Sequence, residues 1–131
     1  MNKPTDPQLL AEDILHRSHC AVQVGAVIAD RHGIFSWAWN HVGDGRGLHA
    51  EQFAIQRANP KRLNGSSIYV AGQRRRNGRI VLAMPCKDCL YSIYMHDIKR
   101  IYWRDPSGGW QYSVHPYREM FDFIYEQAIG Y

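Results

Sequence analysis

The sequence has few cysteines and no long apolar run, and each shortage excludes a class of protein. Only three cysteines occur among 131 residues, two of them in one C-x-x-C segment. The chain is therefore not a disulfide scaffold, and metal or redox chemistry is favoured. No stretch approaches the run of about eighteen apolar residues that a transmembrane helix needs. The opening segment, MNKPTDPQLLAED, lacks the basic and apolar regions of a secretory signal. We therefore predict a cytoplasmic protein with no membrane partner.

Composition and charge restrict the size and the partners of the protein. The sequence is 45% hydrophobic and 21% charged, as in ordinary globular proteins, and it contains no repeat, low-complexity tract or linker. Its length predicts a single domain over residues 1–131. The net charge of +4 and the pI near 9.1 weakly favour a phosphate-bearing partner, so a nucleic acid remains possible.

Apolar periodicity and turn signals predict helices and strands in the order αββαβαββα. Gly43, Gly45 and Gly47 predict a loop before the second helix, and Asn77-Gly78 predicts a tight turn whose return strand runs from 79 to 83. The helices are expected at 7–18, 49–58, 86–96 and 116–129, and the strands at 21–30, 34–40, 67–73, 99–104 and 110–114. This order predicts an α/β fold, a three-layer α/β/α sandwich around a central mixed five-stranded sheet.

The residues that indicate chemistry lie at the starts of two of these helices. Cys86 and Cys89, at positions i and i+3 of one first turn, can direct both sulfurs to one point. A helix N-terminus also favours the thiolate that a metal requires. His49 starts the other helix and can supply an imidazole. Three ligands of this kind leave the fourth tetrahedral position open, so we predict one catalytic Zn²⁺ ion per chain.

Glu51 lies two residues after His49, close to the predicted metal without needing to bind it. A carboxylate in this place can take a proton from water and return it to a substrate, so Glu51 is the candidate catalytic residue. The combination of H-x-E with P-C-x-x-C is the signature of zinc nucleobase deaminases.

Each motif, taken alone, also has an interpretation that involves no deaminase site. An isolated H-x-E carries little information, and an isolated C-x-x-C is also typical of a redox pair. Cys20 could complete a closed Cys3His site that is purely structural. The two motifs together, each at the start of a predicted helix with a strand between them, favour the catalytic interpretation.

From residue 17 to residue 104 the sequence resembles the cytidine and deoxycytidylate deaminase superfamily. The likeness to deoxycytidylate deaminases is greatest in RSHCAVQVGAVI, which starts at Arg17. The matching segments are 17–28, Trp39-Asn40, 49–55 (HAEQFAI), 85–89 (PCKDC) and 98–102 (IKRIY). The resemblance implies a cytidine deaminase-like fold, a hydrogen bond from Asn40 to the sugar and a contact from the Ala50 backbone N–H to the base.

The leading hypothesis is hydrolysis of a cytosine nucleotide or nucleoside, most of all dCMP, to the uracil product and ammonia. We also expect a homo-oligomer. A first alternative is a cytidine or adenosine deaminase acting on tRNA or single-stranded DNA, motivated by the surplus aromatic residues and the basic turn (Arg74, Arg75, Arg76 and Arg79). That turn, an insertion relative to the family, is ordinarily a solvated hairpin tip. A second alternative is a non-catalytic, zinc-stabilised binding module.

Overall fold

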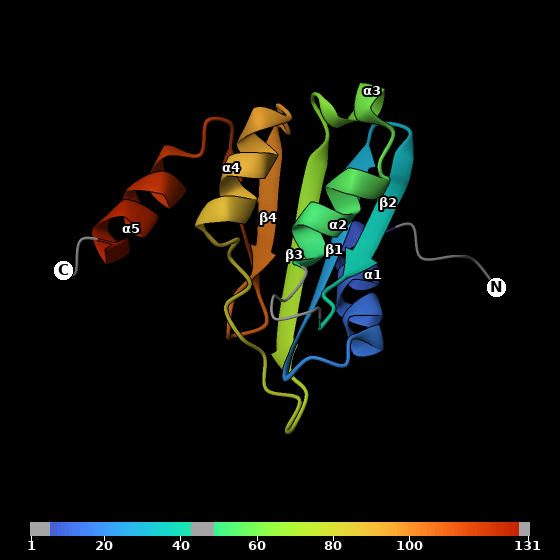
Figure 1. The fold of residues 1–131 in the computed structure, drawn as a ribbon, viewed down its shortest axis with the longest axis vertical. Helices are drawn as coiled ribbons and strands as arrows, with labels where there is room; N and C mark the ends of the chain where they lie inside the picture. The colour runs from blue at the N-terminus through green and yellow to red at the C-terminus, as the bar shows by residue number, and fades with distance from the viewer. Residues whose placement is uncertain (1–5, 43–48, 129–131) are drawn as a thin grey trace.

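The computed structural model describes residues 6–42 and 49–128, which form three layers with a mixed five-stranded sheet in the middle (Figure 1). The predicted α/β sandwich is confirmed. The strands are β1 (Val22–Asp30), β2 (Gly33–Trp39), β3 (Ser67–Arg74), β4 (Arg100–Arg104) and β5 (Trp110–Val114). The helices are α1 (Pro7–Ile14), α2 (Ala50–Arg57), α3 (Pro60–Leu63), α4 (Lys87–Met95) and α5 (Arg118–Ala128). The glycines expected to form a loop, Gly43, Gly45 and Gly47, lie outside the described residues.

The strand order is β2-β1-β3-β4-β5, and β3 and β4 form the parallel pair. The other neighbours are antiparallel: β1 with β2 and β3, and β4 with β5. A parallel pair needs a crossover connection, and here α4 provides it. The start of α4, which carries the C-x-x-C segment, is thereby placed beside the start of α2, and these two helices pack together on one face of the sheet.

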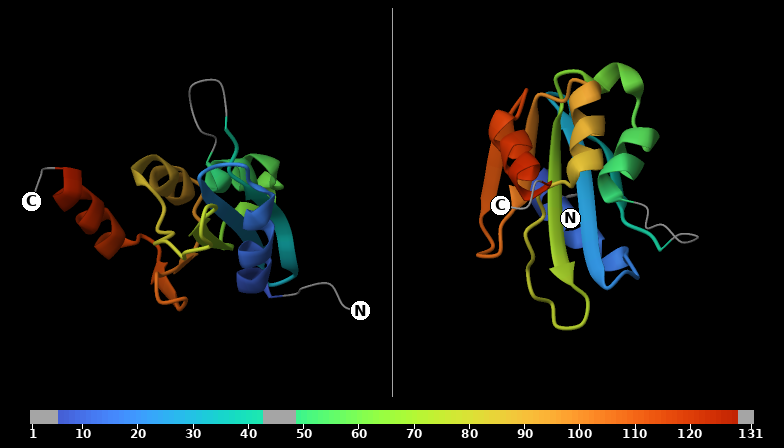
Figure 2. Two further views of the ribbon diagram at one scale, coloured as in Figure 1. Left: turned by 90° about the horizontal axis from the view of Figure 1, so that it is seen from below. Right: turned by 60° about the vertical axis from the view of Figure 1, so that its left-hand side comes forward.

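Helix α1 lies on one face of the sheet and helices α2 and α4 lie on the other (Figure 2), and a hydrophobic core fills the space on each face. The larger core fills the space between the sheet and helices α2 and α4, with Ile28, Val70 and Ile101 beneath Leu90 and Ile93. The smaller core lies under α1 on the opposite face. Helix α5 extends past the β4–β5 side of the molecule.

Gly25 allows α1 to pack directly on β1. A Cβ atom added at Gly25 would lie 2.5 Å from the carbonyl oxygen of Ala11 and 3.0 Å from Cγ1 of Ile14. The first distance is shorter than any real contact of a Cβ, and the obstacle is backbone. Glycine is therefore required here for the close approach of the helix to the strand.

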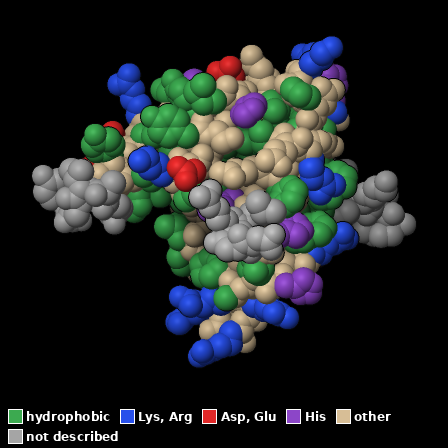
Figure 3. Space-filling model, viewed as in Figure 1, with side chains coloured by type: hydrophobic (Ala, Val, Ile, Leu, Met, Phe, Trp, Pro, Cys, Tyr) green, Lys and Arg blue, Asp and Glu red, His purple; other side chains and the backbone are tan. Residues whose placement is uncertain are grey.

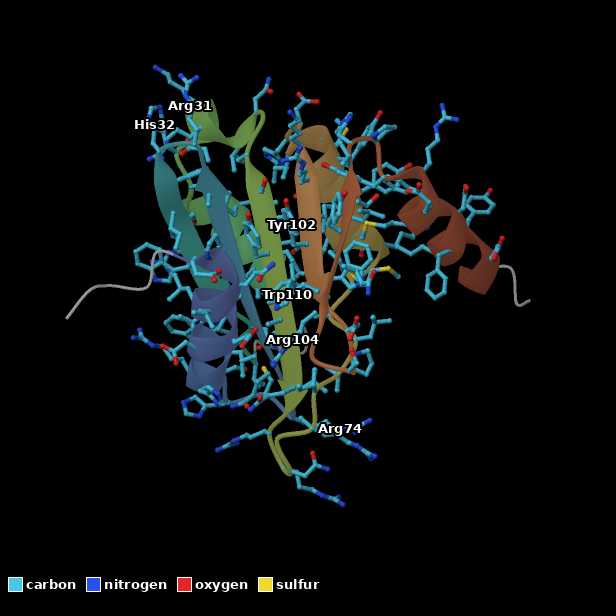
Figure 4. The ribbon with its side chains drawn as sticks, turned by 180° about the vertical axis from the view of Figure 1, so that it is seen from behind. Arg31, His32, Arg74, Tyr102, Arg104 and Trp110 are labelled. Carbon is cyan, nitrogen blue, oxygen red and sulfur yellow. The ribbon has the colours of Figure 1, made fainter. Side chains whose placement is uncertain are left out.

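Helix α1 covers β1 and β3 but leaves β4 and β5 uncovered, and aromatic side chains lie on the uncovered part (Figure 4). The ring of Tyr102 stacks on that of Tyr69 with a centroid distance of 4.5 Å. Trp110 donates a hydrogen bond to Glu12 of α1. None of the helices in the described part of the chain combines the length and apolar character needed to cross a bilayer.

The structure corrects three local predictions. The return strand predicted for residues 79–83 is reduced to one bridge between Gln73 and Ile80. After it, the chain crosses toward β4, where the Ala83 N–H donates to the Arg104 carbonyl. Helix α3 was not predicted, although the Asn59 side chain caps it and Pro60 begins it. The last helix begins at Arg118 rather than at Pro116.

Candidate metal centre

His49 and Cys86 occupy equivalent positions, each one residue before a helix begins. Both have extended backbones and cap their helices without a side-chain hydrogen bond. The imidazole and the thiol are therefore free for another partner, although this position is usually taken by Ser, Thr, Asp or Asn. Cys89 follows in the first turn of α4 and is buried. The partial positive charge of two helix N-termini thus lies beside two thiols.

The ligand atoms of His49, Cys86 and Cys89 lie within 4.8 Å of one another. The Nδ1 atom of His49 is 3.6 Å from the Cys86 sulfur and 3.3 Å from the Cys89 sulfur. A tetrahedral zinc ion bonded to a nitrogen and a sulfur holds these two atoms about 3.5 Å apart. The spacing and the donor set, one imidazole and two thiols, therefore both fit Zn²⁺.

Cys20 is not part of this group. Among the described residues, the cluster of possible metal ligands consists of the three residues above, and Cys20 instead lines the neighbouring pocket. This placement does not favour a closed structural site with four protein ligands, and it leaves the open position that a catalytic metal needs.

The two thiols differ in their readiness to ionise. The hydrogen bond with Cys89, followed by smaller effects from backbone N–H groups and His49, lowers the pKa of Cys86 to about 5. The same hydrogen bond and burial raise the pKa of Cys89. Negative charge is therefore favoured on Cys86, which directly precedes helix α4, where a cation can bind it.

Glu51 is 5% exposed and lies beside the thiols and the imidazole. Burial is the main cause that raises the pKa of Glu51 to about 7, and the charge of Cys86 adds to it. Its own backbone N–H and the nearby His49 act in the opposite direction. A carboxyl group with a pKa near neutrality can both accept and donate a proton at physiological pH, which suits a general acid–base catalyst.

A pocket of about 260 Å³ opens beside these residues, and Glu51, His49 and Cys86 form part of its wall. The opposite wall comes from β1, β3 and the segment that precedes α4. Asn40 and Ala50, the two substrate contacts implied by the sequence, also line it. All the predicted site residues except Cys89 therefore line one cavity. Cys89 is buried and does not reach the cavity surface.

The side chain of Asn40 makes two hydrogen bonds with the backbone of β1. Its oxygen accepts from the Val24 N–H at 2.9 Å and its nitrogen donates to the Val22 carbonyl at 2.8 Å. One N–H of the amide remains for a ligand. The neighbouring His41 also lines the pocket and stacks against Trp39 and Phe53.

Sequence reasoning did not identify the apolar wall of the pocket, formed by Val22, Val24, Gly72 and residues 81–84. These residues carry no motif. They meet because β1 pairs with β3, with Val24 opposite Gly72, and because the chain after the turn folds back over Gly72. Only knowledge of how the strands pair could have identified these residues as one wall of the pocket.

Comparison with known proteins gives a consistent result. The model of the cytidine and deoxycytidylate deaminase zinc-binding region matches residues 8–104, well over half of the chain. Among curated proteins, a sequence comparison finds no match.

Solved structures of deaminases share the fold. The dCMP deaminase from the cyanophage S-TIM5, in its apo form, is 21% identical with a TM-score of 0.63, covering 92% of this chain and 87% of that one. The same enzyme in complex with dCMP and dUMP is 20% identical with a TM-score of 0.62, covering 91% and 87%. The cytidine deaminase from Burkholderia pseudomallei is 16% identical with a TM-score of 0.66, covering 86% and 93%.

Proposed function

The chain belongs to the cytidine and deoxycytidylate deaminase family of zinc-dependent hydrolases, and from this premise we propose that it removes the amino group of a cytosine nucleotide or nucleoside, dCMP foremost. The observation that carries the proposal is the buried Glu51 beside a His-Cys-Cys group in one pocket. The preference for dCMP is supported by the likeness to deoxycytidylate deaminases over residues 17–28. A protein of the same fold has been solved with dCMP and dUMP.

In the proposed reaction His49, Cys86 and Cys89 would hold one zinc ion, which would lower the pKa of a water molecule and so supply a nucleophile at neutral pH. Glu51 would accept a proton from the attacking water while the oxygen of that water bonds to C4 of the base. Glu51 then gives that proton to N3, and it transfers a second proton from the hydroxyl to the departing amino group. The C4–N4 bond breaks, so cytosine and water become uracil and ammonia, and Glu51 ends ionised as it began.

The remaining contacts hold the substrate. We assign to the free N–H of the Asn40 amide a hydrogen bond with the sugar, and to the backbone N–H of Ala50 a hydrogen bond with the base. Ala50 is the first residue of α2, and the N–H groups of a first helical turn have no partner within their helix. The apolar side chains of Val24 and Met84 cover the pocket and exclude water from the base.

A substrate panel tests this function. The zinc-loaded protein is incubated with dCMP, deoxycytidine, CMP, cytidine, tRNA and single-stranded DNA, and released ammonia is measured. We expect dCMP to give the highest kcat/KM. Release from tRNA or single-stranded DNA alone would instead identify a polynucleotide deaminase, and no release from any cytosine compound would contradict the proposal.

The variant Glu51→Gln, whose side chain has nearly the same shape, tests the catalytic role of Glu51. This variant should keep one zinc ion per chain and lose at least about 10⁴-fold in turnover, because an amide cannot carry protons and Glu51 serves several transfers. Turnover within tenfold of the parent protein would show that another group is the base.

A further inference from the structure

Two arginines of the turn after β3 lie directly opposite each other. Arg74 donates its backbone N–H to the Arg79 carbonyl at 2.8 Å, and the adjacent residues Gln73 and Ile80 form a bridge. The next pair inward is Gly72 and Val81, joined by a hydrogen bond of 3.2 Å. Residues opposite each other in an antiparallel pair share a face, so Arg74 and Arg79 lie on one face of this ribbon.

That face is the face of the catalytic pocket. Gly72 and Val81 both line the pocket, and side chains return to the same face every second residue. Val22, which pairs with Arg74 across β1 and β3, lines the pocket as well. Arg74 and Arg79 therefore lie just outside the pocket, two residues or about 7 Å along the ribbon from Gly72 and Val81.

The charge of this pair has no carboxylate partner. Arg74 and Arg79 are exposed, and within the described ranges 6–42 and 49–128 no acidic side chain forms a salt bridge with either. Like charges placed opposite each other in an antiparallel pair are unfavourable. Basic side chains gather at the lower end of the molecule in Figure 3, around the turn, and Figure 4 shows Arg74 at the end of β3.

The two other arginines of the turn are placed differently. The guanidinium of Arg75 donates to the carbonyl of His19 at 3.3 Å, so it already has a partner within the chain, and Arg75 alternates with Arg74 along the ribbon. Arg76 lies at the tip, beyond the paired residues. If the turn were only a solvent-exposed tip, nothing would favour placing two of its four arginines side by side on the pocket face.

We propose that Arg74 and Arg79 bind the phosphate group of the substrate while its base lies at Glu51. This inference rests on the proposed function and identifies the substrate as a nucleotide rather than a nucleoside. Guanidinium groups bind phosphate oxygens with charge-assisted, often bidentate hydrogen bonds, and a phosphate monoester carries up to two negative charges at neutral pH. An anion between the two arginines also removes their mutual repulsion.

The test compares two double variants that each remove two positive charges from the same turn. Steady-state kinetics on dCMP and on deoxycytidine give the preference for the nucleotide, the ratio of the two kcat/KM values. We expect Arg74→Gln with Arg79→Gln to lower this ratio by at least about 100-fold, since the double variant loses two hydrogen bonds between charged groups. The control, Arg75→Gln with Arg76→Gln, should change the ratio by less than about threefold. Equal loss in both double variants would overturn the proposal.

A second measurement separates this inference from the proposed function. Binding of inorganic phosphate, followed by broadening of its ³¹P resonance, requires no turnover. We expect broadening by the parent and by the control, and much less by the variant at positions 74 and 79. If the parent turns over no cytosine compound but this pattern holds, the proposed function fails and the phosphate site stands. If all three proteins broaden the signal equally, the phosphate site is wrong. The phosphate proposal is also wrong if single-stranded DNA gives a higher kcat/KM than dCMP and both double variants lower that value equally.

Discussion

Glu51 should destabilise the folded chain above mildly acidic pH, and its replacement by Gln should reveal by how much. Burial raises the pKa of this carboxyl from 4.5 to about 7. Between these two pH values the unfolded chain releases the proton while the folded chain keeps it, so stability falls as pH rises through this window. The difference, at about 1.4 kcal/mol for each pH unit, corresponds to about 3 kcal/mol.

The assay is urea unfolding of the parent and of Glu51→Gln after removal of zinc with a chelator, at several pH values from 4.5 to 8. Titrating groups that do not interact with Glu51 contribute equally to both proteins, so they cancel in the difference between the two unfolding free energies. We expect this difference to move in favour of the Gln variant by about 3 kcal/mol between pH 4.5 and pH 8, and to be level above that. A difference constant within about 0.5 kcal/mol would refute the desolvation of Glu51.

Three further predictions concern the metal, the α1 contact and an ion pair. Cys20→Ser should retain about one zinc ion per chain by metal analysis whereas Cys89→Ser should lose it; zinc loss in Cys20→Ser would indicate a closed structural site. Gly25→Ala should lower the free energy of urea unfolding by at least about 1–3 kcal/mol, because the new Cβ overlaps backbone of α1; an unchanged urea midpoint would contradict this packing. Arg62 lowers the pKa of Asp30 through a 2.7 Å ion pair, so the stabilisation is present above the ordinary pKa of Asp30 and is lost as pH falls below it. Arg62→Gln should therefore remove part of the acid sensitivity seen in thermal unfolding, and an identical pH profile would argue against the pair.

The sequence predicted those parts of the fold that depend on local signals. The alternating apolar residues of β1 and the turn residues before β5 placed both strands within one residue of their observed bounds. The helix starts at His49 and Cys86 were predicted from the glycines that precede His49 and from Pro85, and in the structure both residues lie directly before a helix. These signals involve residues close together in the chain, where propensity and periodicity are informative.

What the sequence could not provide depends on pairing between distant segments. The Asn77-Gly78 signal predicted a turn correctly, and the Gly78 N–H bonds back to Arg74, but it did not show that the return strand would leave after one bridge. That departure follows from a tertiary contact between Ala83 and β4. The pairing of Arg74 with Arg79 on the pocket face likewise becomes visible only once the turn is built on β3.

The Asn40 side chain accepts a hydrogen bond from Val24 and donates one to Val22, and both bonds hold β2 in register with β1. The β1–β2 pairing contains an irregularity between Ile28 and Ala29, so the register of the later part of β2 depends on the pairs from Ile28 back to Gly25 and on Asn40. Because side chains alternate along a strand, a slip of one residue would exchange its two faces. Trp39 would then take the place of Ala38, which belongs to the buried core between β2 and α2. An indole in that space would lift α2 from the sheet and carry His49 with it. The Asn40 side chain at the end of β2 thus helps to set the position of His49, a predicted metal ligand.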